Sequence, residues 1–337
     1  METLTPHQHN LRLMAETPPS LRFRGGEPFE DWQNRARDTL RELLGMDRFS
    51  PCDLQFSAEP SVAWHGGRRT RFTFQSEMGY TVPGYWCVPA DAGPWPVMIC
   101  LQGHSTGMHI SMGEEKFPGD AAEVGDGDRD YAKQALDRGF AALVLEQRNF
   151  GECGGTPKGP DCYRSAMAAL LLGRTTLGER VWDVSRAIDV LEMNFQEADQ
   201  SRIFCMGNSG GGTATFYATC LEPRIRGAMP SCSICSFDAS IAPIHHCACN
   251  HVPHIRRFFD MGDLAGLIAP RPLTVVAGEQ DGIFPIGATR ETFALIQDYY
   301  AAAGRPDRCQ LIVGSGGHRF YAEPGWTSFL KLTQEIR

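Results

Sequence analysis

The sequence of 337 residues lacks the features that mark nucleic-acid-binding and membrane proteins. Its 32 lysines and arginines form no basic run, only four of them are lysines, and 40 acidic residues give a net charge of -8. No window approaches the roughly 18 consecutive apolar residues of a membrane span, and the first residues show no basic start followed by an apolar core. These absences predict a cytoplasmic chain with neither nucleic acid nor membrane as partner.

Internal repeats and low-complexity tracts are also missing, and the twelve cysteines do not form the pattern of a disulfide framework. Most of them lie in apolar strand or helix contexts, such as Cys87, Cys100, Cys205 and Cys220. In a chain long enough to bury a large core, such cysteines are expected to be buried and reduced. Length and composition favour one large α/β domain with an extension over two small domains.

Residues 1–60 differ from the rest of the chain and predict a helical extension. Apolar side chains recur there at helical spacing until Gly45, at Phe29, Trp32, Ala36, Leu40, Leu43 and Leu44. This pattern predicts an amphipathic helix that packs on the main domain, residues 61–337. A helix that binds a partner or a second copy is the alternative, so the oligomeric state stays open.

Strand and helix patterns alternate over the main domain. Strands are expected at 71–75, 82–88, 96–101, 140–145, 202–206, 227–230, 273–277 and 310–313, and helices at 131–138, 176–194, 210–221, 256–267, 286–302 and 325–335. The first two strands flank a plausible hairpin turn at 76–79. The alternation predicts the α/β class, with a mostly parallel twisted sheet covered by helices on both faces. A ligand site is expected at the carboxyl ends of the strands.

The chemistry centres on residues 202–212, where an apolar strand leads into Gly-x-Ser-x-Gly and a helix. This is the pattern of a nucleophile elbow, in which a sharp turn exposes Ser209 above the sheet. An ordinary glycine-rich turn would also explain the motif alone, but the flanking strand and helix favour the elbow.

A serine nucleophile needs a histidine base and a carboxylate that orients it, in the chain order serine, acid, histidine. Asp281 follows the strand at 273–277, and His318 follows the last strand, so all three residues are expected on one rim of the sheet. Glu279 is a rival for the acid. A turn aspartate and a capping or solvated histidine are the alternatives without catalytic roles.

The developing oxyanion requires backbone donors that are already in place. One is expected from the N–H of Gly210, directly after the nucleophile. The second is expected from the N–H of His104, in the Gln102-Gly103-His104 segment after the strand at 96–101, unless that segment is only a loop. Arg148 is a candidate for binding an anionic substrate group, with a structural salt bridge as its alternative.

A cysteine- and histidine-rich stretch gives the strongest competing signal. It holds eight soft ligands, namely Cys232, Cys235, His245, His246, Cys247, Cys249, His251 and His254. Cys-x-x-Cys followed by histidine and cysteine is compatible with tetrahedral zinc, but the Cys-x-Cys pair is tighter than usual finger spacings. We therefore expect this stretch to form pocket wall or core, and we predict no metal.

Taken together, these residues resemble the α/β-hydrolase superfamily over roughly residues 61–337, and within it the acetyl xylan esterase and dienelactone hydrolase-like branch. The resemblance rests on residues 101–104, 146–151, the Ser209 elbow, 245–250, 259–264, the Ala-Pro-Arg-Pro segment within 268–273, and finally Asp281 and His318. It implies a mostly parallel sheet and no cofactor. Gln102, where histidine is usual, departs from the commonest pattern.

The expected function is that of a serine carboxylic-ester hydrolase acting on a small-molecule ester through an acyl-enzyme. Small acyl groups of acetyl type, including those on carbohydrates, are suggested by the resemblance alone. A peptidase or amidase with the same triad and a non-catalytic binding protein with a hydrolase fold are the alternatives. A lipase is disfavoured because the 104–127 loop is polar rather than an apolar lid.

Overall fold

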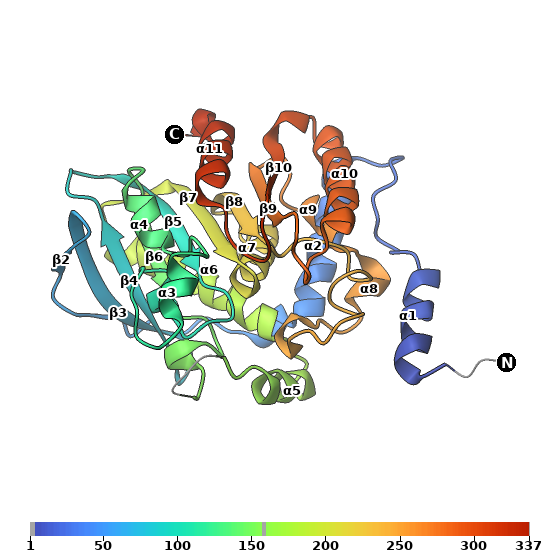
Figure 1. Ribbon diagram of the computed structural model, residues 1–337, viewed down its shortest axis with the longest axis horizontal. Helices are drawn as coiled ribbons and strands as arrows, with labels where there is room; N and C mark the ends of the chain where they lie inside the picture. The colour runs from blue at the N-terminus through green and yellow to red at the C-terminus, as the bar shows by residue number, and fades with distance from the viewer. Residues whose placement is uncertain (1–3, 157–159, 337) are drawn as a thin grey trace.

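A ten-stranded sheet forms the centre of the protein (Figure 1). The computed structural model describes residues 4–156 and 160–336. In spatial order the sheet runs β1-β3-β4-β6-β5-β7-β8-β9-β10, with β2 paired to β3. The strands are β1 Ser57–Ala58, β2 Val62–Trp64, β3 Gly67–Glu77, β4 Tyr80–Val88, β5 Trp95–Leu101, β6 Ala141–Leu145, β7 Ala198–Asn208, β8 Ile225–Ser231, β9 Leu273–Gly278 and β10 Cys309–Gly314.

Six neighbouring strands are parallel to one another, in the spatial order β6, β5, β7, β8, β9 and β10. Strands β1 to β4 add an antiparallel edge. In the register of β5 and β7, Leu101 lies opposite Gly207. The loops that follow these two strands therefore emerge side by side. This confirms the predicted mostly parallel α/β sheet and brings the 102–104 segment next to Ser209.

Helices cover both faces of the sheet. One face packs against α4 and α11, and the other packs against α2, α6, α7 and α10. The helices are α1 Pro6–Glu16, α2 Phe29–Leu44, α3 Asp120–Val124, α4 Tyr131–Leu136, α5 Tyr163–Leu171, α6 Thr176–Asn194, α7 Gly210–Leu221, α8 Ile255–Phe258, α9 Met261–Ala265, α10 Ile286–Ala302 and α11 Ala322–Leu332.

Helix α2 occupies the residues predicted for it and ends at Gly45, whose φ of 72° is left-handed. Its apolar side joins the main core. The Trp32 ring lies 5.0 Å from that of Tyr299 on α10, and the Gln33 amide donates to the carbonyls of Gly266 and Ala269. The helix thus packs against the sheet domain of its own chain, while a domain boundary near residue 60 stays a prediction.

One expected helix is divided. The pattern at 256–267 predicted a single helix, but α8 ends at Phe258 and α9 begins at Met261. Asp260 caps α9, and the buried Asp263 three residues later closes a capping box, so the local hydrogen bonds favour a new start. A capping signal outweighs apolar periodicity here.

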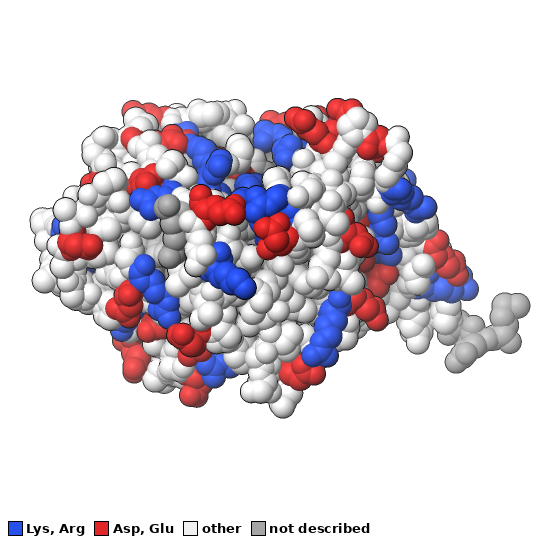
Figure 2. All heavy atoms as spheres, turned by 90° about the horizontal axis from the view of Figure 1, so that it is seen from above, with Lys and Arg blue, Asp and Glu red and all other residues white. Residues whose placement is uncertain are grey.

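None of the helices in the described ranges is long and apolar enough to cross a membrane. On the face seen in Figure 2, acidic and basic side chains are interspersed and no large area of one sign is present. That distribution agrees with the scattered charges of the sequence.

Candidate functional site

Ser209 stands at the sharp turn between β7 and α7. Its φ of 56° and ψ of -124° are strained for a residue with a side chain, and its N–H donates to the Ser231 carbonyl at 2.9 Å. The neighbouring glycines make the turn possible. A Cβ at Gly211 would lie 2.0 Å from the Leu101 carbonyl oxygen. The backbone therefore has the conformation of a nucleophile elbow.

Asp281 and His318 meet at the same rim, from the loops after β9 and β10. His318 Nδ1 lies 2.8 Å from Asp281 Oδ2, and Asp281 Oδ1 accepts from the N–H groups of Ile283 and Phe284. Burial alone would raise the pKa of the Asp281 carboxyl, but its contacts with His318 and the two N–H groups lower it below 3.8. The carboxylate stays ionised and fixes the imidazole. The rival Glu279 is exposed and pairs with Arg290 instead.

Ser209 and His318 line one cavity of about 330 Å³. The Nε2 atom of His318 is buried and has no hydrogen-bond partner in the part of the chain that the structure describes. The Phe284 ring stacks on the imidazole with centroids 5.9 Å apart. The rest of the lining consists of His104, Glu123, Arg129, Ile244, His245, His246, Cys247 and Ile283. An imidazole with one satisfied and one free nitrogen thus faces the cavity that Ser209 lines.

The loop after β5 lies against the elbow. A Cβ at Gly103 would come within 2.8 Å of the Asn208 carbonyl oxygen and 3.2 Å of Ser209 Cβ, so only glycine allows this approach. A Cβ at Gly210 would lie 2.8 Å from the His104 ring. Because Gly210 opens α7, its N–H belongs to the first turn, whose donors have no partner within the helix. The geometry juxtaposes the two residues expected to supply oxyanion donors.

Gln102 is buried where the commonest pattern has histidine, and the structure gives it a role. Its side-chain amide donates to Glu146 Oε1 at 2.5 Å, and its main-chain carbonyl accepts from the Gln147 side chain. Glu146 also accepts from the N–H groups of Met108 and Glu152. Burial raises the pKa of Glu146 to about 7, against the opposing effect of these N–H donors. Gln102 and Glu146 together anchor the 102–108 segment.

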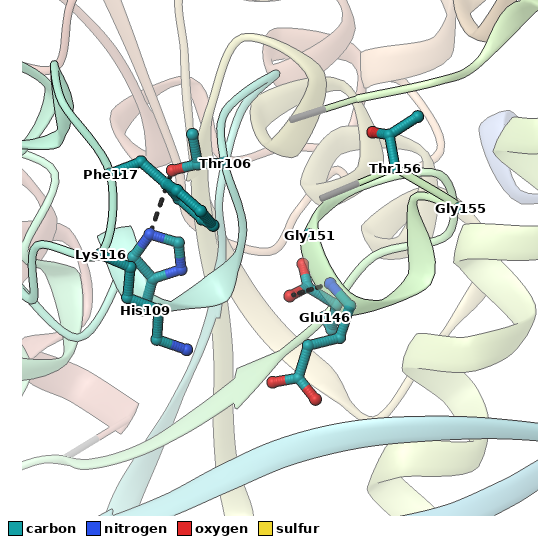
Figure 3. Close-up of a pocket in the computed structure, with 9 residues that line it drawn as sticks. Thr106, His109, Lys116, Phe117, Glu146, Gly151, Gly155 and Thr156 are labelled. Atoms are coloured by element: carbon teal, nitrogen blue, oxygen red, sulfur yellow. Dashed lines mark hydrogen bonds between the residues drawn. The ribbon is translucent and has the colours of Figure 1, made fainter. Parts of the chain in front are cut away.

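Glu146 also borders a second cavity of about 400 Å³, shown in Figure 3. On its other side His109 contacts Thr106, and His109 Nε2 lies 2.8 Å from Asp120 Oδ2. Both members of this histidine–aspartate pair are buried, and burial lowers the pKa of His109 despite Asp120. Asp120 further accepts from the N–H groups of Lys116 and Phe117. The pair fastens the loop between β5 and α3.

Arg148 has the contacts of a structural ion pair, the second of its two interpretations. Its guanidinium binds both carboxylate oxygens of Asp183 at 2.8 Å, reaches Glu77 at 2.6 Å, and lies 4.1 Å from the Tyr80 ring. The residue is only 7% exposed and is absent from the lining of the Ser209 cavity. The substrate-binding role expected for Arg148 is corrected accordingly, because its charge is already neutralised inside the protein.

The fold does not bring the eight soft ligands of the 232–254 stretch together into one group. Cys232 lies beside Asp281 and His318, where its thiol contacts the Arg319 carbonyl, and burial raises its pKa to about 12. Cys235 packs near Pro285. Only His245, His246 and Cys247 line the Ser209 cavity, as pocket wall. Burial, with the charges of His104 and His251, lowers the pKa of His246 to about 4, which keeps its ring neutral.

Residues 174–258 match the acetyl xylan esterase (AXE1) family. A solved structure from Bacteroides fragilis NCTC 9343, assigned as an acetyl xylan esterase, aligns with 96% of this chain and 84% of its own at a TM-score of 0.78 and 17% identity. The chain has the α/β-hydrolase fold.

Two further similarities agree with this fold. A glucuronoyl esterase from Solibacter usitatus aligns with 95% of this chain and 97% of its own chain, at a TM-score of 0.70 and 17% identity. YtaP of Bacillus subtilis (strain 168), named as a hydrolase, is 23% identical over 246 residues, which is 70% of this chain and 77% of that protein. These similarities confirm the predicted α/β-hydrolase fold. They also confirm the resemblance to acetyl xylan esterases that the sequence motifs indicated.

Sequence reasoning missed Glu123 and Arg129, an ion pair on the cavity rim. Arg129 also donates to the His318 carbonyl at 3.4 Å, so it supports the loop that carries the histidine. Both residues lie in the polar segment between β5 and α4, where no periodic pattern predicts which side chains turn inward. No signal in the sequence would have found them.

Proposed function

We propose that this α/β-hydrolase is a serine carboxylic-ester hydrolase in which Ser209, His318 and Asp281 form the triad. The observation that carries the proposal is the strained Ser209 on the same cavity as an aspartate-held histidine whose Nε2 is free. The esterases among the structural relatives support the reaction class. Fold alone would not, because one fold hosts many chemistries.

The reaction divides into two displacements. His318 Nε2 takes the proton of Ser209 Oγ as the oxygen attacks the ester carbonyl carbon, and the carbonyl electrons move to the oxygen. The N–H groups of Gly210 and His104 hold that oxyanion. The C–O bond then breaks, His318 protonates the departing alcohol, and an acyl-Ser209 remains. Water repeats the steps, giving its proton to His318, and releases the acid and free Ser209.

Substrate size is proposed from the cavity. A volume of about 330 Å³ lies at the lower end of the range for small-molecule sites, which fits a small acyl group of acetyl type. An adjoining cavity of about 720 Å³ shares His104, His245, His246 and Cys247 with it and is proposed to hold the rest of the ester. Names of relatives suggest a carbohydrate ester, and that extension rests on them alone.

A panel of esters tests this assignment. The wild-type protein and Ser209→Ala would be compared on 4-nitrophenyl esters of increasing acyl length, on an acetylated sugar and on a matched anilide. We expect turnover that is highest for acetate and lost by about 10⁶-fold in the variant. Undiminished hydrolysis by Ser209→Ala would contradict the triad, and faster anilide than ester cleavage would favour an amidase.

A further inference from the structure

Four soft metal ligands from three separate segments converge at the 102–104 segment after β5. They are His104 after β5, Cys162 just before α5, and Cys247 and Cys249 in the loop between β8 and α8. Their ligand atoms all lie within 4.8 Å of one another. His104 Nε2 and Cys247 Sγ each lie 3.2 Å from Cys249 Sγ. We refer to these four residues as the Cys3His cluster.

The spacing of the Cys3His cluster matches the size of a zinc site. Tetrahedral zinc with bonds of about 2.3 Å to sulfur and about 2.0 Å to nitrogen separates two sulfurs by roughly 3.8 Å and a sulfur from a nitrogen by roughly 3.5 Å. Two of the observed separations are 3.2 Å and none exceeds 4.8 Å, a range that includes these values. Small rotations of the side chains would therefore close the site around one ion. Three cysteines and one histidine are also a common ligand set of structural zinc.

Charge gives a second, independent argument. Arg180 is 1% exposed, stacks on Phe150 at 4.2 Å, and directs its guanidinium at Cys249 Sγ and Cys162 Sγ at 3.6 and 3.8 Å. Its other bonds go to the neutral Arg148 carbonyl, and no carboxylate in the described ranges pairs with it. A buried cation without a counter-charge is costly. Zinc with three thiolates and a neutral imidazole carries a charge of -1, which Arg180 would neutralise.

Other groupings of the soft ligands fit metal less well. Cys232 and Cys235, the pair with finger-like spacing, point to the Arg319 and Pro285 carbonyls and lie outside the cluster. Cys232, Asp281 and His318 are also close together, but Asp281 and His318 are hydrogen-bonded to each other in the proposed triad. The Cys3His cluster is the set with four ligands and a compensating cation.

We propose that His104, Cys162, Cys247 and Cys249 bind one zinc ion in a closed structural site. Three thiols would release their protons to solvent as three Zn–S bonds and one Zn–N bond form. Because protein ligands fill all four positions, the ion has no open site for water or substrate. Its effect would be to fasten the His104 loop to the α5 and β8–α8 segments. This proposal replaces our sequence-based expectation that the chain binds no metal.

Metal analysis tests the proposal without any substrate, so its outcome is independent of the proposed function. Protein purified with a phosphine reductant and no chelator would be analysed for zinc per chain, alongside Cys249→Ser, Cys162→Ser and the control Cys235→Ala. We expect roughly one zinc in wild type and in the control, and most of it lost in the two cluster variants. Zinc that Cys249→Ser retains in full would overturn the site.

Cobalt substitution keeps the test decisive if a cluster variant fails to fold. Metal-free wild-type protein would be titrated with Co²⁺ while its visible spectrum is recorded. We expect thiolate-to-cobalt charge-transfer absorption and tetrahedral d–d bands that saturate at one equivalent, and that zinc abolishes by displacement. A wild-type protein that holds no zinc and gives no thiolate–cobalt spectrum overturns the proposal. So does a metal-free wild type in which two of these cysteines form a disulfide.

Discussion

Replacing Gly103 by alanine tests most sharply the proposed role of the 102–104 segment in holding the oxyanion. Gly103 has an ordinary φ, so alanine is allowed by its own backbone, but the new Cβ would lie 2.8 Å from the Asn208 carbonyl oxygen and 3.2 Å from Ser209 Cβ. The new Cβ would be fixed to the Gly103 backbone and the Asn208 oxygen belongs to the backbone, so rotation of a side chain cannot relieve this contact. Relief to normal carbon–oxygen contact requires a shift of roughly half an ångström or more between the 102–104 segment and the elbow.

That shift sets the size of the expected effect. The N–H of His104, one residue on, would move out of its position for the developing oxyanion. Losing one such donor costs about 10²–10³-fold in kcat, and a misplacement of about 1 Å costs about 10²-fold. We therefore expect kcat to fall about 10²-fold in Gly103→Ala, with little change in KM. The crowded contact should also lower the free energy of unfolding by about 1–3 kcal/mol.

The matched control is Gly287→Ala in the first turn of α10. It introduces the same methyl group where no atom lies within 4 Å, and its φ is also ordinary. We expect unchanged kcat and a slight gain in stability, because alanine favours a helix over glycine. Both variants would be assayed on a 4-nitrophenyl acetate series, with urea unfolding to correct for folded protein. Gly103→Ala with kcat within twofold of wild type would refute this role for the loop.

Three further outcomes follow from named contacts. Asp281→Asn should lower kcat by about 10⁴-fold with the fold intact, because the histidine tautomer is no longer fixed; a loss under tenfold contradicts the triad. Since burial raises the pKa of Glu146 from 4.5 to about 7, the folded state binds a proton that the unfolded state releases between those pH values. The free energy of unfolding should fall by up to about 3 kcal/mol as pH rises through that window, and Glu146→Gln should remove this decrease. Parallel pH profiles of stability for the wild type and Glu146→Gln would contradict this assignment. Arg148→Met leaves the buried carboxylate of Asp183 without its ion pair, whereas Glu77 keeps Arg174, and should cost about 3–5 kcal/mol in urea unfolding with kcat per folded molecule kept; an unchanged stability would return Arg148 to the list of substrate residues.

Much of the fold follows from local pattern. Helices at 29–44, 176–194 and 286–302 were predicted to the residue because their apolar faces and stop signals agree with the packing. Helix α1 was missed although Thr5 and Gln8 form a capping box that the sequence displays. Its residues are largely exposed, so apolar periodicity gave no signal.

The candidate site divides in the same way. Ser209, Asp281 and His318 each follow a strand, and strand ends of a parallel sheet meet at one edge, so their neighbourhood was predictable. The Cys3His cluster was not, because His104 and Cys162 lie far along the chain from Cys247. Spacing rules pointed instead to Cys232 and Cys235, which the fold turns in other directions. Only the tertiary structure reveals ligands that long loops bring together.

The central claim is that Ser209 is an activated nucleophile, and covalent labelling tests it directly. Wild-type protein and Ser209→Ala would be incubated with a fluorophosphonate, and their intact masses and labelled peptides determined. The account predicts one adduct per wild-type chain, located on Ser209, and none on the variant. No adduct on folded wild-type protein, or equal labelling of Ser209→Ala, would contradict it.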